Sequence, residues 1–130
     1  MTLTEIRNAV IKRMTAQAAV PAGSVTYPND PTFDPSGKAI WARLTNLPGI
    51  AGAVEIGDGP VVHRTGTIII QLFVPTGSRS LLITETADAI RELFEFQTDG
   101  ALDYFAVSAV DAGETDGWAQ LNLSIPYRAM

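Results

Sequence analysis

Cysteine is absent from the 130-residue sequence, and histidine occurs only once, at position 63. Without thiolates the chain forms neither a disulfide framework nor a thiolate metal site, and a lone imidazole excludes a metal site with two histidine ligands. His63 stands beside Arg64 at the start of a strand-like segment, a position typical of a strand-edge residue rather than of a catalytic base. The sequence thus offers no catalytic, cofactor-binding or metal-binding residues, and we expect a protein that is not an enzyme.

Charged residues are scarce as well, at 18% of the chain against 46% apolar residues, whereas soluble domains average roughly 25% charged residues. Such a composition fits a subunit of an assembly, and it equally fits a small monomer rich in alanine and glycine. The longest apolar stretch lies within residues 68–74, far short of the ~18 residues that span a bilayer. Charges at the N-terminus, from Glu5 to Arg13, argue against a targeting segment, so we expect a cytoplasmic protein without membrane contact.

Acidic residues outnumber basic ones by fourteen to nine, which gives a net charge of −5. This balance opposes the counterion release that drives binding to nucleic acid, so we expect no sequence-specific nucleic-acid recognition. An acidic subunit is nevertheless compatible with DNA that slides past it, because like charge keeps a pore wall from holding phosphates.

The first segment has the pattern of an amphipathic helix. Thr2 and Glu5 have the spacing of a capping box, and Pro21 and Gly23 follow the apolar repeat, so we predict a helix over residues 3–19. Its apolar residues at helical spacing are Leu3, Ile6, Val10 and Met14.

A proline-rich segment follows at residues 28–37, after a short β-like run at 24–27. It holds three prolines, one glycine and two aspartates in ten residues, which excludes the interior of a helix or strand. Loops of this length are often functional, so this one is the first candidate for a contact to a partner. The spacing of Asp30 and Asp34 does not match a calcium-binding loop, and we interpret both as turn-capping residues.

Three strands are expected in the middle of the chain. Residues 39–46 alternate between apolar and polar positions, Leu47-Pro48-Gly49 is expected to turn the chain, and residues 51–56 form a second strand that ends in a tight turn at 57–60. The return strand over 61–74 is rich in Val, Thr, Ile and Phe, and Ile68-Ile69-Ile70 implies burial on both faces. We therefore expect this strand in the centre of the sheet.

The second half is predicted to contain one more helix and two more strands. The helix covers about 79–95, and Ser78 or Ser80 can cap its N-terminus. A strand over 102–110, a flexible polar turn over 111–117 and a strand from Trp118 to Pro126 follow. We expect one domain of the α+β class over residues 1–130, with a single mainly antiparallel β-sheet and two α-helices packed on one face.

Two tryptophans stand out because each alternates with polar neighbours in its strand. Trp41 and Trp118 would then lie on the side of the strand that is expected to face solvent, and exposed tryptophan is rare unless something covers it. A helix of the same chain and a neighbouring subunit are both open as the cover.

The order of several segments and their amino-acid sequences resemble those of the tail terminator family of long-tailed bacteriophages. The matching elements are the opening helix, the hairpin into His63-Arg64-Thr65-Gly66 with the strand up to Pro75-Thr76-Gly77, the helix from Ala87 to Phe94, and the closing segment from Trp118 to Arg128. Short motifs such as Arg-Thr-Gly before a strand or Pro-Thr-Gly after one are common in turns. The resemblance therefore depends on the order of all these segments over most of the chain.

The resemblance implies a structural virion protein without cofactors, assembled as a hexameric ring. Such a ring binds the last ring of tail-tube protein, halts tube growth and offers a surface to the head-completion proteins, while DNA passes through it. The implied location is the virion tail, and the host cytoplasm during assembly. Partner contacts are expected in residues 28–38, 57–63 and 111–117. The candidate contact residues are Asp30, Phe33, Asp34, Trp41, Asp58, His63, Arg64, Arg79, Glu114, Asp116, Trp118 and Arg128.

Two other functions stay open from the sequence. A head-completion or neck subunit of a phage would share the small size, the acidic balance and the ring assembly. A small-ligand-binding α+β module would instead be a monomer with an apolar pocket.

Overall fold

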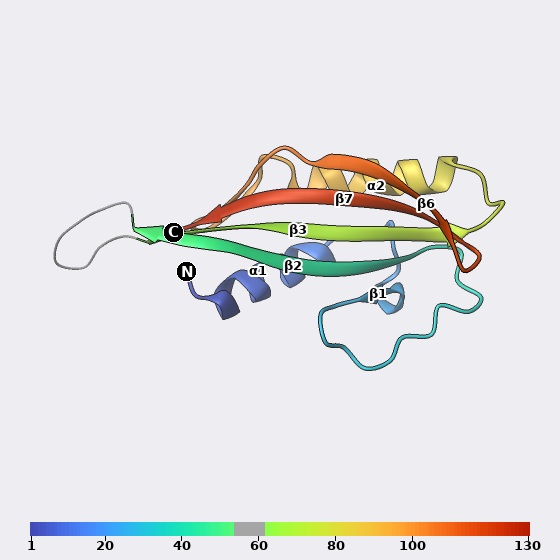
Figure 1. The fold of residues 1–130 in the computed structure, drawn as a ribbon, viewed down its shortest axis with the longest axis horizontal. Coiled ribbons are helices and arrows are strands. Elements are labelled where there is room, and N and C mark those ends of the chain that lie inside the picture. The colour runs from blue at the N-terminus through green and yellow to red at the C-terminus, as the bar shows by residue number, and fades with distance from the viewer. Residues whose placement is uncertain (54–61) are drawn as a thin grey trace.

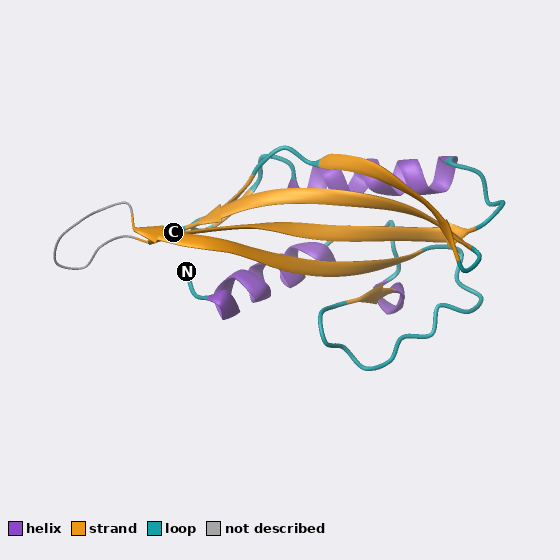
Figure 2. Ribbon diagram, viewed as in Figure 1, coloured by secondary structure: helices purple, strands orange, loops and turns teal. Residues whose placement is uncertain are grey.

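A long β-sheet with two helices against one of its faces makes up the described part of the chain, residues 1–53 and 62–130 of a computed structural model (Figures 1 and 2). The expected tight turn at 57–60 and Asp58 lie outside these residues. The elements are α1 (Leu3–Thr15), the short 3-10 helix η1 (Ala22–Ser24), β1 (Val25–Thr26), β2 (Trp41–Ala53), β3 (Val62–Pro75), α2 (Leu81–Phe94), β4 (Thr98–Asp99), β5 (Leu102–Tyr104), β6 (Ser108–Thr115) and β7 (Trp118–Ala129).

The strands follow the order β1-β2-β3-β7-β5-β4, and β6 also pairs with β7. All pairs are antiparallel except β1 with β2. The strand β3 runs between β2 and β7 over most of its length, which confirms its predicted central position. Both β5 and β6 pair with the edge of β7 that faces away from β3, β5 at the C-terminal end of β7 and β6 along the rest.

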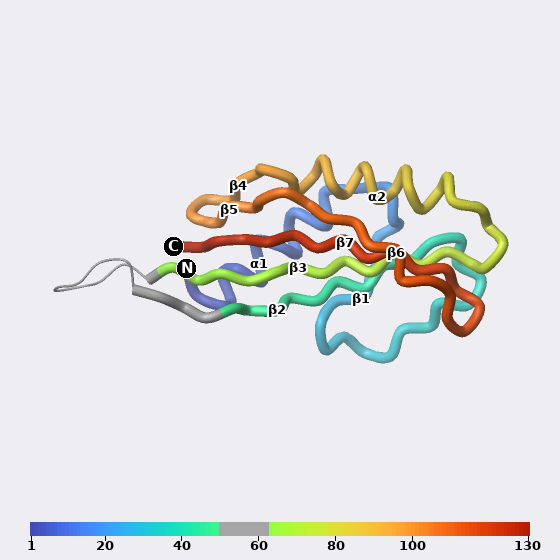
Figure 3. The backbone as a smooth tube through the Cα atoms, turned by 45° about the horizontal axis from the view of Figure 1, so that its top comes forward, coloured from blue at the N-terminus to red at the C-terminus, as the bar shows by residue number. Residues whose placement is uncertain are grey.

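Both helices pack on the same face of this sheet, which confirms the predicted α+β class (Figure 3). One continuous apolar cluster joins them to alternate residues of the long strands, as the period of two requires. Within Ile68-Ile69-Ile70 the outer two residues are fully buried in this cluster, and Ile69 is half-buried on the opposite side. The cluster includes Ile6, Val10 and Met14 of α1, Ile83, Ile90 and Phe94 of α2, and Leu44, Ile70, Leu72, Leu123 and Ile125 of the sheet.

The predicted start of α1 is confirmed, and its predicted end is four residues too late. Thr2 and Glu5 form the capping box in both directions. The helix ends at Thr15 because the side chain of Gln17 bonds to both backbone groups of Val20, at 2.9 and 2.8 Å. These bonds replace helical hydrogen bonds and turn Val20 into the core.

The prediction that Leu47-Pro48-Gly49 turns the chain is wrong, because β2 continues through these residues. The strand shifts its register against β3 between Pro48 and Ala51. Proline is tolerated at this position because the outer side of β2 is an edge of the sheet, where no backbone N–H is needed for the ladder. The segments expected as two strands, 39–46 and 51–56, therefore belong to one long edge strand as far as it is described.

The predicted bounds of the strand at 102–110 and of the polar turn at 111–117 are wrong. The structure has two strands in this region, β5 and β6, with a break between them. Residues 105–107 leave the ladder opposite Pro126, whose missing N–H cannot pair; Phe105 donates to the carbonyl of Pro126 at 2.9 Å instead. The strand then resumes as β6 up to Thr115. Only Asp116 and Gly117 form the turn, both with positive φ (53° and 82°), as in a type I′ hairpin.

Candidate interaction surfaces

Four aromatic rings gather on the face of the sheet opposite the helices, which we call the open face. Trp41 stacks on Phe73 with ring centroids 4.0 Å apart, and Trp118 meets Trp41 edge-on at 5.9 Å. Phe33 covers the cluster from the proline-rich loop, 5.2 Å from Trp41. Trp41 is only 5% exposed, because the loop of its own chain covers it. The sequence had left a helix or a neighbouring subunit open as the cover, and this loop is neither of them; Trp118 is half-buried.

The proline-rich loop is folded back by local hydrogen bonds. Asp30 accepts from the backbone N–H of Tyr27 at 2.9 Å, and Asp34 accepts from that of Ser36 at 3.0 Å. The bond from Ser36 lowers the pKa of the exposed Asp34 carboxyl. These contacts agree with the interpretation of both aspartates as turn-capping residues, and they hold the loop in the position from which Phe33 reaches Trp41.

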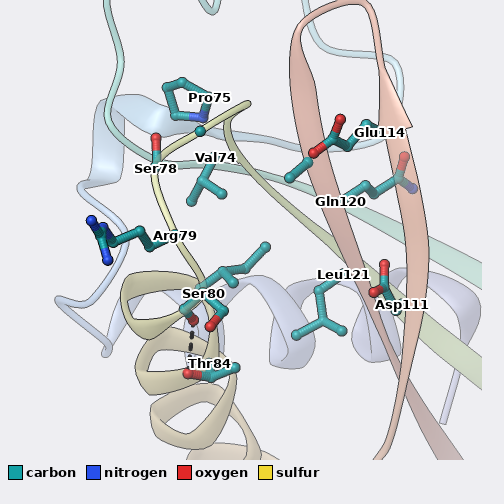
Figure 4. A pocket seen from close by; sticks show the side chains of 13 residues that line it. Val74, Pro75, Ser78, Arg79, Ser80, Thr84, Asp111, Glu114, Gln120 and Leu121 are labelled. Atoms are coloured by element: carbon teal, nitrogen blue, oxygen red, sulfur yellow. Dashed lines mark hydrogen bonds between the residues drawn. The ribbon is translucent and has the colours of Figure 1, made fainter.

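The turns next to this aromatic cluster border a cavity of about 370 Å³ between the start of α2 and strand β6 (Figure 4). Arg79, which has a positive φ of 66°, and Glu114 both line it. The neighbouring turns are tied together, since the N–H of Thr76 donates to the carbonyl of Gly117 at 2.8 Å. Two predicted contact residues from distant parts of the sequence thus share one cavity, and Asp116 lies exposed in the adjoining turn.

His63, Arg64 and Arg128 lie toward the end of the sheet where the two chain termini meet (Figure 1). The N-terminal amine donates to the carbonyl of Met130, and Arg64 donates to the carbonyl of Met1 at 3.0 Å. Arg128 pairs with Asp103 at 3.4 Å and lies over the ring of Phe105. His63 is half-buried on β3. The candidate residues therefore divide between the two ends of the molecule.

The three long strands lack acidic residues, a pattern that was not predicted from the sequence. None of the residues of β2, β3 and β7 within their described bounds is Asp or Glu, although the chain has fourteen such residues. Beyond the aromatic cluster, the open face carries mainly amides and hydroxyls together with Arg43. A count of acids strand by strand would have found this pattern. Its neutral members include Thr45, Thr67, Gln71, Gln120, Asn122 and Ser124.

One ionic network ties α1 to the segment that follows α2. Arg13 makes a two-pronged contact with Asp99, each bond 2.8 Å long, and also donates to the carbonyl of Leu93 at 2.7 Å. Tyr104 donates to the same carboxylate at 2.9 Å. The bond from Arg13 lowers the pKa of Asp99, while burial raises that of Tyr104. All groups of this network are used in holding the fold together.

Within residues 1–53 and 62–130 no group of three or more potential metal-ligating His, Asp or Glu side chains occurs. In the same part of the chain no helix is long and apolar enough to cross a membrane. This architecture defines a class of protein: a two-layer α+β domain with loops at both ends of the sheet and an edge strand on each side.

Comparison with known proteins identifies the family. The family model described as phage tail terminator protein matches residues 5–127, and the chain belongs to this family. It is therefore a structural protein of the phage tail. A solved structure with 20% sequence identity and a TM-score of 0.74, over 100% of this chain and 96% of that chain, shares the fold. A comparison with curated proteins finds no match.

Proposed function

We propose that this protein forms a ring that closes the phage tail tube. In this proposal copies of the chain form a hexamer that binds the last ring of tail-tube protein, stops polymerisation and presents a surface to the head-completion protein. It acts without catalysis or cofactor, in the host cytoplasm during assembly and afterwards in the virion tail. The observation that carries the proposal is the family match over residues 5–127.

The arrangement of the loops supports two different contacts at the two ends. One end presents the proline-rich loop and the turn at Asp116, and the other presents the paired termini with Arg64 and Arg128. A subunit that must bind a tube on one side and a head protein on the other needs two such unlike ends. The scarcity of acids on the three long strands also leaves one face of each subunit without the charge that would repel DNA in the channel.

The experiment is polymerisation of purified tail-tube protein with increasing amounts of this protein, with tube lengths measured by negative-stain electron microscopy. A terminator shortens the mean length in proportion to the number of capped ends. An unchanged length distribution would overturn the proposal and would favour a neck subunit. A control with heat-denatured protein excludes an effect of added protein mass.

A further inference from the structure

Strand β6 is an edge strand without protection on its outer side. All eight of its residues are exposed, and among the described residues it pairs with β7 alone. It contains no lysine, arginine or proline, the residues that commonly keep edge strands from pairing with another chain. A register shift between Asp111 and Gly113 and the turn after Thr115 limit the regular part to Ser108–Asp111. This short segment offers free backbone groups for one more strand.

The opposite edge of the sheet, along β2, has a matching free segment. The parallel strand β1 covers only Ala42 and Arg43, and Pro48 cannot donate a hydrogen bond to an incoming strand. Between them, residues 44–47 have an open outer side. Leu47 at the end of this segment is 54% exposed, and Val110 in the middle of the free part of β6 is 58% exposed.

The directions of the two free segments suit an antiparallel pairing between two copies of the chain. Since β2, β3, β7 and β6 alternate in direction, β6 runs opposite to β2. A rotation about an axis along the strands keeps these directions, so it would bring β6 of one subunit antiparallel to β2 of the next. The cross-strand rows place Ala109 level with Leu44, and Asp111 level with Ala42. Because β1 occupies the outer side of Ala42 and Arg43, a displacement of two residues along the strands is needed, and it brings Ser108–Asp111 opposite residues 44–47.

The surroundings of the two edges are complementary in charge. On the helix side of the β2 edge, Arg7 borders a groove of about 190 Å³ between α1 and Leu44. On the helix side of β6, Asp111 and Glu114 border the cavity of about 370 Å³. In the part of the chain that the structure describes, neither Arg7 nor the two acids take part in an ion pair. Arg79 also lines this cavity, but it comes from the turn before α2 and not from the sheet edge. The free segment of β6 thus carries an acid, and the groove beside the free segment of β2 carries a base.

We infer that β6 of one subunit pairs antiparallel with residues 44–47 of β2 in the next subunit, so that one sheet continues around the ring. Asp111 then lies opposite Leu44, beside the groove that Arg7 borders on the helix side, and Val110 lies opposite Thr45 on the open face, diagonal to Leu47. The partner is a second copy of this chain, because the opposite directions of the two edges, the equal length of their free segments and the charges beside them fit each other. The inference rests on the proposed ring and names its subunit interface.

Engineered disulfides test the interface, because the natural chain has no cysteine. Opposed residues of antiparallel strands have Cα atoms about 4.5–5.5 Å apart, within the range of about 4.4–6.8 Å that a disulfide accepts. The variants are Val110→Cys on one edge, and Thr45→Cys and Leu47→Cys on the other, so that two registers are covered. They are mixed in pairs with tail-tube protein present and oxidised under mild conditions.

The expected result is a disulfide-linked dimer when Val110→Cys meets Thr45→Cys, or Leu47→Cys if the register is displaced by two further residues, and none when each variant is oxidised alone. A chain that carries both cysteines should give a ladder of linked species that ends at the closed ring. The matched control is Asp88→Cys on α2, whose side chain is 70% exposed; mixed with Val110→Cys or Leu47→Cys it should give no product.

Charge reversal supplies a second readout that does not depend on disulfide formation. Arg7→Glu and Asp111→Arg should each cause loss of the assembly in sedimentation velocity, because each places like charges at every interface. The chain with both changes should regain it. Equal loss in the double variant would overturn the Arg7–Asp111 contact.

The outcomes separate this inference from the proposed function. If tubes are shortened but neither cysteine pair is linked, the interface is wrong and the terminator function stands. If the cysteine pairs are linked but tube lengths are unchanged, the interface stands and the terminator function is wrong. If tubes are not shortened and no pair is linked, both are wrong.

Discussion

The ring of Tyr127 lies directly across the backbone of Gly66, so that a β-carbon on residue 66 would come within 2.5 Å of the ring atom Cζ. The two residues are cross-strand partners of β3 and β7. The hydroxyl of Tyr127 continues past this glycine and donates to the side chain of Asn46 on β2 at 2.9 Å. Gly66 therefore lets one side chain connect the three long strands.

Gly66→Ala should lower the free energy of unfolding by about 1–3 kcal/mol, because the tyrosine must leave its position and lose its bond to Asn46. Chemical denaturation measures the change. The matched control is Gly23→Ala, where the added carbon meets nothing within 4 Å. Equal stability of the two variants would show that the close approach of Tyr127 does not matter.

Phe33→Ala should loosen the proline-rich loop from the aromatic cluster. The loss of a half-buried ring that contacts Trp41 should cost about 1–2 kcal/mol. Because Trp41 becomes hydrated, its fluorescence emission should shift to longer wavelength. Thr32→Ala, at the exposed neighbouring position, should leave the spectrum unchanged, and an unshifted spectrum in Phe33→Ala would contradict the role of the loop as a cover.

Removal of the Arg13 side chain should separate α1 from the segment after α2. Arg13→Ala leaves Asp99 with only the hydroxyl of Tyr104 as a partner and should lower the free energy of unfolding by about 2–3 kcal/mol. Lys12→Ala, at an exposed position of the same helix, should change it by less than about 0.5 kcal/mol. Urea denaturation of both variants tests the difference, which should vanish if the Arg13 contacts add nothing.

Asp99 should also make stability depend on pH in the acid range. Its pKa in the folded protein is lowered, chiefly by the hydrogen bond from Arg13, so its contribution is present above its unfolded pKa of about 3.9 and is lost as pH falls through the folded pKa. Asp99→Asn should therefore be less stable than the natural chain near neutral pH, with a difference that shrinks below about pH 4. A difference that stays constant down to pH 2 would contradict this.

Much of the fold could be predicted because its signals are local. The capping box at Thr2, the run of β-branched residues in β3 and the period of two after Trp118 each depend on neighbours in sequence. The errors fall where the deciding partner is distant. Pro48 continues a strand because that strand is at an edge, and residues 105–107 leave the sheet because Pro126 lies opposite.

The candidate surfaces also combine features that depend on sequence neighbours with features that depend on distant parts of the chain. Alternation in the sequence correctly set Trp41 apart from the apolar core residues of its strand, whereas its cover depends on how residues 28–38 fold back. The cavity between α2 and β6 could not be predicted, since β6 was expected to be largely a turn. The absence of acids on three strands needed no structure and was open to inspection in the sequence.

The most direct test of the tube-closing ring uses tubes grown from tail-tube protein with one fluorescent dye and incubated with this protein carrying a second dye. Tail-tube protein with a third dye is then added, and each tube end is scored by microscopy. The account predicts that this protein sits at one end of each tube and that no new growth extends from a marked end. Growth beyond marked ends, or label spread along the tube walls, would contradict it.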